Sequence, residues 1–279
     1  MAIELATQFQ PYVDEKFTTE AKKTLVTNGD YDWTGAHSIK VYKIGTSAMT
    51  DYDRSGTGTG KNGSRYGEVA SLDASTEEMT LKKDRSFTFA IDKLDTDETK
   101  RTLQAAEALE RQIREVVIPE IDTYVFNEMV KGAGHKATPE VLTDKNIYEK
   151  IILGNAALDN AEVPEAGRAL IVTPDVYLLM KKNPDIVLNT DIGQDMRVRG
   201  VIANLDGANV IKVPANRLPE KFGFLLCHSV ATVSPQKLED YKVHEDPPGI
   251  SGSLVEGRIC YDAFVLDNKK KAIYYQALK

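Results

Sequence analysis

Apolar and polar positions that alternate over part of residues 37–45 and 78–91 predict two half-buried β-strands. Between them, residues 51–67 are polar and contain five glycines in 17 positions. Such a segment has almost nothing to bury, and ordering it costs much conformational entropy. A loop of this length within a compact domain is usually either functional or disordered. We therefore expect a projecting hairpin whose tip becomes ordered only against another copy of the chain.

Apolar residues at spacings of three and four then predict one long amphipathic helix over residues 96–130. Asp95 and Glu98 have the spacing of a capping box at its start, and Pro119 is expected to kink or divide it. A single helix of this length would span about 50 Å, so its apolar stripe needs a long partner surface. The stripe consists of Leu103, Ala106, Leu109, Ile113, Val116, Val117, Ile121, Tyr124 and Val125.

A compact α/β section follows, after Gly132 or Gly134 as the expected helix C-cap. Thr143 is expected to cap a helix from Asp144 to about Leu158 that carries its isoleucines inward. The expected inward residues are Ile147, Ile151 and Ile152.

A buried strand over residues 168–173 comes next, and Thr173 with Pro174 opens another helix that runs through Lys182. The polar residues 183–199 predict a loop, and Asp206-Gly207 predicts a tight hairpin between two short strands. Residues 241–276 read mostly as strands. The order of elements predicts an α+β fold.

Composition limits the classes of partner. Lys and Arg total 35 against 42 for Asp and Glu, a net charge of −7 that disfavours tight wrapping of nucleic acid. No apolar run approaches the roughly 18 residues of a membrane-spanning helix, and we expect no membrane partner. The N-terminus lacks the pattern of a signal peptide. The two cysteines, Cys227 and Cys260, fit a reducing compartment, and Cys227 is expected to be a small buried hydrophobe.

Catalytic chemistry finds little support in the sequence. A formal match to the dinucleotide fingerprint at Gly58, Gly60 and Gly63 is not followed by the helix start that the motif requires. The four histidines are scattered and have no zinc-ligand spacing. We expect no enzyme activity, no metal and no cofactor.

Four basic residues on the long helix alternate with glutamates, which is typical of ordinary i,i+4 pairing. An inner face that touches packaged DNA is the alternative. The residues are Lys100, Arg101, Arg111 and Arg114.

Four stretches, taken in order, resemble the major capsid proteins of tailed bacteriophages with the Hong Kong 97-type fold. Residues 37–68 resemble the family's extended E-loop, and residues 85–99 resemble the strand that returns into its spine helix. Residues 119–124 resemble the later part of the spine, and two stretches between 241 and 268 resemble its peripheral sheet. Together these span most of the chain.

The resemblance implies a division of the chain along the family's pattern. The expected parts are an N-terminal arm (1–36), the E-loop with flanking strands (37–92), the spine helix with peripheral-domain residues (93–139), an axial domain (140–235) and a C-terminal peripheral-domain sheet (236–279).

The resemblance also implies sites of contact. The E-loop residues expected at a subunit interface are Asp51, Tyr52, Asp53, Arg54, Lys61, Arg65 and Tyr66. The loop expected near the centre of pentamers and hexamers carries Asp191, Asp195, Arg197 and Arg199. Some family members join subunits through a Lys–Asn isopeptide bond. Lys61 lies in the right loop for the donor and Asn268 is a conceivable acceptor, but without a matching motif the plain interpretation is a solvated lysine.

The leading hypothesis is a major capsid protein that assembles through pentamers and hexamers into an icosahedral phage head enclosing double-stranded DNA. The implied partners are further copies of the chain, a separate scaffolding protein, a portal and non-specifically bound DNA, in a virion assembled in the host bacterial cytoplasm. An encapsulin-type nanocompartment shell is the first alternative. A soluble α+β enzyme is the second, and it would require an activity that depends on His228 or Asp240.

Overall fold

The computed structural model describes residues 21–29, 38–56, 64–67, 71, 74–94, 104–188 and 204–279. The chain divides into two compact units. The larger comprises Met1–Thr34 together with Lys82–Lys279, and the smaller comprises Gly35–Leu81. The proposed capping box at Asp95 and Glu98 and the glycines of the fingerprint match lie outside the described residues.

The smaller unit is built on an antiparallel hairpin of β1 (Ser38–Ile44) and β2 (Ala74–Thr80). Ser38 pairs with Thr80 at one end and Ile44 with Ala74 at the other. An ion pair of 3.0 Å between Lys43 and Glu77 crosses the two strands. The hairpin expected from the sequence is therefore present.

The prediction of one returning strand over residues 78–91 is wrong. The chain forms two strands there, β2 and then β3 (Lys83–Asp92), and they belong to different sheets. The break falls where the backbone N–H of Lys82 donates to the buried carboxylate of Asp262 (2.9 Å) instead of to a neighbouring strand.

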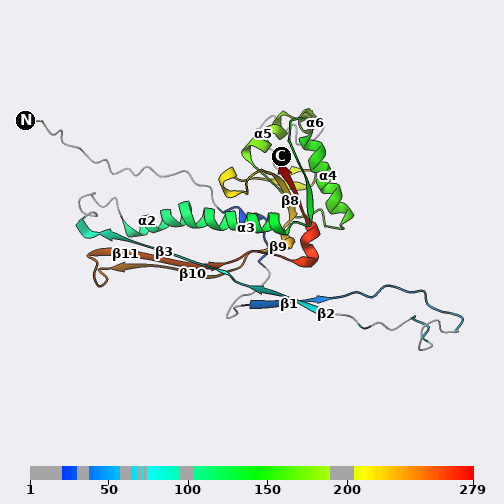
Figure 1. The fold of residues 1–279 in the computed structure, drawn as a ribbon, viewed down its shortest axis with the longest axis horizontal. Helices are drawn as coiled ribbons and strands as arrows, with labels where there is room; N and C mark the ends of the chain where they lie inside the picture. The colour runs from blue at the N-terminus through cyan, green and yellow to red at the C-terminus, as the bar shows by residue number, and fades with distance from the viewer. Residues whose placement is uncertain are drawn as a thin grey trace, which may run out of the picture. The chain divides into compact units, whose positions relative to one another are not determined.

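In the larger unit, β3 joins a three-stranded antiparallel sheet in the order β10 (Gln236–Glu245), β11 (Gly252–Tyr261), β3. The middle strand places Gly257 opposite both Phe87 and Tyr241. The two rings stack with their centroids 6.1 Å apart, in the space that a side chain at Gly257 would fill. The long helix runs beside this sheet (Figure 1).

The long helix consists of α2 (Ala105–Gln112), a π-helical turn η2 (Ile113–Val117) and α3 (Ile118–Gly132). The expected division near Pro119 is confirmed, because the π-turn ends just before it. Val117, Ile121, Val125 and Met129 are buried at spacings of four. Val116 was expected on the same face but is exposed, since its neighbour Val117 takes the inward position.

The expected glycine C-cap of this helix is also wrong: the cap residue is Ala133, with extended backbone. The glycines serve close approach instead. A Cβ at Gly132 would meet Val265 at 2.7 Å, and the N–H of Gly134 donates to the carbonyl of Lys270 (2.8 Å).

A six-stranded mixed sheet forms the centre of the larger unit. The order is β4 (His135–Glu140), β13 (Ile273–Leu278), β8 (Phe222–His228), β5 (Arg168–Val172), β7 (Ala208–Lys212) and β6 (Asn204–Leu205). Every residue of β5 and β8 is buried. Both faces of these central strands are therefore covered, as the buried strand expected over residues 168–173 suggested for β5.

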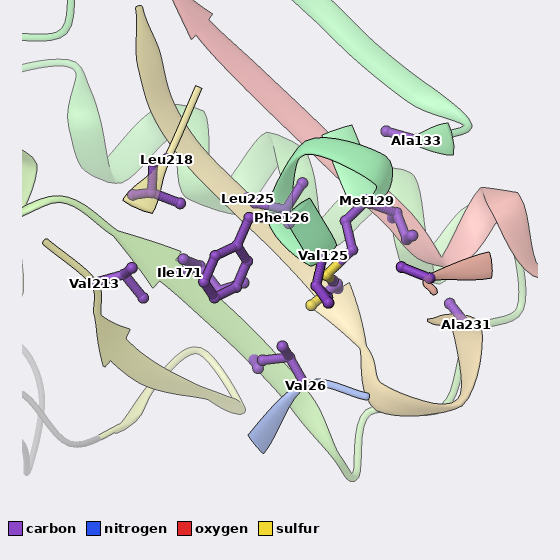
Figure 2. Close-up of a cluster of buried hydrophobic side chains, with 14 of the residues drawn as sticks. Val26, Val125, Phe126, Met129, Ala133, Ile171, Val213, Leu218, Leu225 and Ala231 are labelled. Atoms are coloured by element: carbon purple, nitrogen blue, oxygen red, sulfur yellow. The ribbon is translucent and has the colours of Figure 1, made fainter. Parts of the chain in front are cut away.

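The two faces of the sheet carry separate cores. On one face, Ile171 and Leu225 pack with Val125, Phe126 and Met129 of α3, and Figure 2 shows these side chains converging. The other face packs against α4 (Ile147–Asn160) and α5 (Pro174–Lys182) through a second set of residues. That set includes Leu170, Val172, Phe224, Leu226, Ile147, Ile151, Leu158, Val176 and Met180.

The helix expected from Asp144 begins three residues later, at Ile147. Thr143 still has the capping contacts expected of it: Thr143 and Asn146 exchange hydrogen bonds between side chain and backbone as in a capping box, and the N–H of Ile147 donates to the carbonyl of Thr143 (3.1 Å). Ile147 and Ile151 are buried as predicted, but Ile152 is exposed, because adjacent residues in a helix point about 100° apart.

The prediction for α5 is confirmed: the side chain of Thr173 accepts from the N–H of Val176 (3.3 Å) ahead of Pro174. The expected loop at 183–199 is partly wrong, since a short helix α6 (Pro184–Leu188) begins it. Asp206-Gly207 does join β6 to β7.

Short elements complete the larger unit. They are η1 (Lys23–Leu25), η3 (Ala215–Arg217), η4 (Ser229–Ala231), β9 (Thr232–Val233), β12 (Phe264–Val265) and η5 (Asp267–Ala272). β9 pairs with β12, and Asn28 forms a bridge to Val233.

Candidate assembly surface

The two sides of the loop between β1 and β2 are held together at a neck, by which we mean residues 50–56 and 64–67. The hydroxyl of Thr50 donates to the carbonyl of Tyr66 (2.8 Å), and the N–H of Asp53 donates to the carbonyl of Arg65 (2.9 Å). The rings of Tyr52 and Tyr66 meet edge to face, with centroids 5.0 Å apart. The neck therefore has local structure of its own.

Tight turns shape the neck further. The N–H and hydroxyl of Ser55 both donate to the carboxylate of Asp53. Gly56 and Gly67 have positive φ angles of 76° and 86°, which side chains adopt rarely. A Cβ at Gly67 would also lie 2.6 Å from the hydroxyl oxygen of Thr50.

The smaller unit exposes large apolar side chains on its strands and neck. Met49 is 100% exposed and Tyr66 79%. The others are Tyr42, Ile44 and Tyr52. An isolated two-stranded hairpin is marginally stable in water, and exposed apolar groups that gather on one segment are typical of an interaction surface.

The structure describes six of the seven residues expected in the E-loop interface, and among them it joins Tyr52 to Tyr66 and Asp53 to Arg65. The six are Asp51, Tyr52, Asp53, Arg54, Arg65 and Tyr66. The seventh, Lys61, lies outside the described residues, so the expectation of a solvated lysine rather than a bond to Asn268 is not tested. Thr50 was missed by the sequence analysis. A threonine before a polar glycine-rich run carries no signal of a cross-loop hydrogen bond.

The four residues expected at the capsomer centre, Asp191, Asp195, Arg197 and Arg199, lie outside the described residues. So do Lys100 and Arg101 of the long helix. Arg114 is described, and its guanidinium contacts Glu110 at 3.2 Å, one helical turn away. This contact is the i,i+4 pairing that the charge pattern indicated. Arg111 lies beside Phe89 and Glu115, at a groove between the helix and β3.

The residues that the sequence offers for catalysis are buried or take part in hydrogen bonds and ion pairs with their neighbours. Cys227 is buried in β8 as predicted, and burial raises the pKa of its thiol to about 12. The ring of His228 lies 2.8 Å from the carbonyl oxygen of Ala166 and accepts a hydrogen bond from the N–H of Val230. Asp240 forms an exposed ion pair with Lys242 (2.7 Å).

Within the described ranges, no three His, Cys, Asp or Glu side chains gather as metal ligands would. No helix in the same part of the chain is long and apolar enough to span a membrane.

Comparison with known proteins gives matches among solved structures alone. No family model matches the chain, and no curated protein does. A structure from Mycobacterium phage Che8 is similar to this chain, with a TM-score of 0.79 at 15% identity. The match covers 98% of this chain and 97% of the phage chain. The capsid structure of cyanophage P-SCSP1u has a TM-score of 0.73 at 13% identity, with coverage of 99% and 93%.

A virus-like particle from Pyrococcus furiosus is also similar, with a TM-score of 0.56, 12% identity and 92% coverage of both chains. The chain thus has an α+β fold that it shares with phage capsid structures over nearly its whole length. This confirms the fold expected from the sequence resemblance.

Proposed function

We propose that this chain is the major capsid protein of a tailed bacteriophage. Many copies would assemble through pentamers and hexamers into an icosahedral head that encloses double-stranded DNA. The main support is the full-length likeness to the capsid structure of cyanophage P-SCSP1u, with a TM-score of 0.73. The apolar side chains exposed on Gly35–Leu81 agree with it, because a shell built from one chain needs such contacts between copies.

In this proposal the loop neck contacts a second copy of the chain through Tyr52, Tyr66 and the charged residues beside them. Asp191, Asp195, Arg197 and Arg199 would lie near the capsomer centre, in an axial domain of residues 140–235. Lys100, Arg101, Arg111 and Arg114 would face packaged DNA. A separate scaffolding protein, a portal and assembly in the bacterial cytoplasm complete the proposal, and no catalytic role is part of it.

A nanocompartment shell of the encapsulin type is the second candidate, because the likeness extends to the virus-like particle from Pyrococcus furiosus. Its TM-score of 0.56 is lower than the 0.79 of the phage structure, which favours the phage head. The contents of purified shells distinguish the two: one defined cargo protein indicates a nanocompartment, whereas DNA indicates a phage head.

The experiment that tests the proposal removes residues 52–66. We expect the variant to keep a cooperative unfolding transition and to lose shell formation, seen by light scattering after size exclusion and by negative-stain electron microscopy. The matched control is the double substitution Ser38→Ala and Thr80→Ala, which alters the far end of the hairpin and leaves the neck intact.

Normal shells from the deletion variant would contradict the role of the loop. If the full chain forms no shells, tubes or rings of five or six, even with scaffold and crowding agent, the capsid proposal itself is wrong. We also expect the free subunit to bind DNA weakly, without sequence preference and with strong dependence on salt. Tight binding at physiological salt would contradict the proposed arrangement.

A further inference from the structure

Two buried carboxylates accept hydrogen bonds from backbone segments that lie before and after the smaller unit in the sequence. Asp122 is fully buried and accepts from the backbone N–H groups of Lys22 (3.0 Å) and Lys23 (3.3 Å), which precede the hairpin. Asp262 is 2% exposed and accepts from the N–H of Lys82 (2.9 Å), the first residue after it. Of the two acids, Asp262 contacts the backbone directly at an end of the smaller unit.

Both carboxylates are linked to the same short stretch of α3. Asp122 belongs to that helix, and two residues further along it the hydroxyl of Tyr124 donates to Asp262 (2.7 Å). The ammonium of Lys83 lies 5.0 Å from the centroid of the Tyr124 ring, a second contact between the returning chain and the helix. The backbone of Lys22, Lys23 and Lys82 is therefore held at about one turn of α3.

The hydrogen bonds of Asp262 divide between its two oxygens. Oδ2 accepts from Lys82, whereas Oδ1 accepts from Tyr124 and from the N–H of Ala263 (2.8 Å). Burial, together with the hydrogen bond to Asp262, raises the pKa of Tyr124, so its hydroxyl remains a donor throughout the ordinary pH range. Hydrogen bonds to a charged carboxylate are among the stronger ones in proteins.

From this geometry we infer that Asp262 is a positioning residue for assembly. It holds Lys82, the first residue after the smaller unit, against α3, so that this end of the hairpin is anchored before the loop neck meets a second copy. The inference rests on the proposed function. Preorganisation of this kind lowers the entropic cost of binding, and its loss weakens association even when every contact at the interface is retained.

The test compares Asp262→Asn with Asp84→Asn in the full-length chain. The first substitution keeps the shape of the side chain but replaces one accepting oxygen with a donor. The second alters an exposed carboxylate at the start of β3 that pairs with Arg258. Hydrogen exchange read by mass spectrometry, the urea midpoint and the lowest concentration that forms shells are measured for both.

For Asp262→Asn we expect exchange at Lys82 and Lys83 to rise about tenfold, the effect of losing roughly one hydrogen bond, with the remaining peptides of the larger unit close to wild type. The assembly threshold should rise several-fold, while Asp84→Asn leaves both measurements unchanged. Equal loss of protection over the whole unit, or an unchanged threshold with faster exchange at Lys82, would overturn the inference.

Tyr124→Phe gives a second measurement if Asp262→Asn does not fold. It keeps the ring under Lys83 and deletes only the hydroxyl donated to Asp262. We expect exchange at Lys82 and Lys83 and the assembly threshold both to rise, by less than in Asp262→Asn. Wild-type behaviour of Tyr124→Phe would overturn the inference. Hydrogen exchange is measured on the subunit and does not require shells. A wild-type chain that never assembles would therefore refute the proposed function, while the exchange data would still test the contact between Lys82 and Asp262.

Discussion

The guanidinium of Arg217 donates to the carboxylate of Asp122 across 2.9 Å, and both side chains are almost completely buried. This ion pair joins η3, which follows β7, to the middle of α3. The same carboxylate holds the backbone of Lys22 and Lys23, so one acid connects three segments that are distant in sequence.

Arg217→Met should destabilise the larger unit by about 3–5 kcal/mol, because it leaves the charge of Asp122 buried without its cation. The free energy of unfolding in urea measures the effect. Arg258→Met is the matched control, since the Arg258–Asp84 pair is exposed and should contribute little. Equal effects of the two substitutions would show that burial of the Asp122 pair does not matter.

Lys23→Met should stabilise the protein at neutral pH. The Lys23 ammonium is buried and has no hydrogen-bond partner within the described residues, and burial lowers its pKa despite the charges of Asp122 and Glu239. The unfolded chain binds this proton up to about pH 10.5, whereas the folded chain releases it at lower pH. Stability therefore rises with pH through that interval, and the cost is fully present below the folded pKa.

Urea unfolding at pH 7 and pH 10 tests this sign. The advantage of Lys23→Met over wild type should shrink at the higher pH, whereas Lys131→Met, at an exposed pair with Glu128, should show no such change. An advantage that grows with pH would contradict the assignment.

Thr173→Ala should cost about 1 kcal/mol, because it removes the side-chain acceptor at the start of α5. Thr173→Ser keeps the hydroxyl and should recover most of the loss. The free energy of unfolding measures both variants. If Thr173→Ser were as unstable as Thr173→Ala, the methyl group of Thr173 rather than its hydroxyl would be what stabilises the protein.

Gly257→Ala should destabilise the three-stranded sheet by about 1–3 kcal/mol through overpacking. Its methyl group would collide with the ring of Phe87 and lie 2.9 Å from Cδ1 of Tyr241. Adding Phe87→Leu should restore part of the loss in urea unfolding. Gly29→Ala is the control, because a Cβ there meets nothing within 4 Å.

The elements that the sequence predicts well are those in which local chemistry and burial agree. β5 is apolar without interruption and lies between two cores, while Thr173 and Pro174 start α5 through local hydrogen bonds and backbone geometry. The failures depend on distant contacts. The alternation stops after Leu81, where five polar residues follow, but it does not tell a strand break from a solvated stretch; the contact that marks the break comes from Asp262, 180 residues away.

The candidate surface could be predicted in composition but not in geometry. Tyr52 and Tyr66 stand out as aromatic residues in a polar segment, yet their edge-to-face contact and the hydrogen bond from Thr50 to Tyr66 join positions 14 and 16 residues apart. Such pairings depend on loop closure, which no local pattern of residues encodes. Asp122 and Asp262 likewise look like ordinary acids in sequence, and only burial distinguishes them.

The π-turn at Ile113–Val117 has a further consequence for how this chain tolerates changes in length. A π-turn contains one more residue than the α-helical turn it replaces, so the long helix carries the equivalent of a single-residue insertion at its middle. Deletion of one residue there would convert the π-turn into an α-turn, which completes the same rotation with one residue fewer, so α2 would keep the same side toward the sheet. The extra residue thus changes only the spacing in sequence: a related chain without it would carry the apolar positions of α2 one residue closer to those of α3.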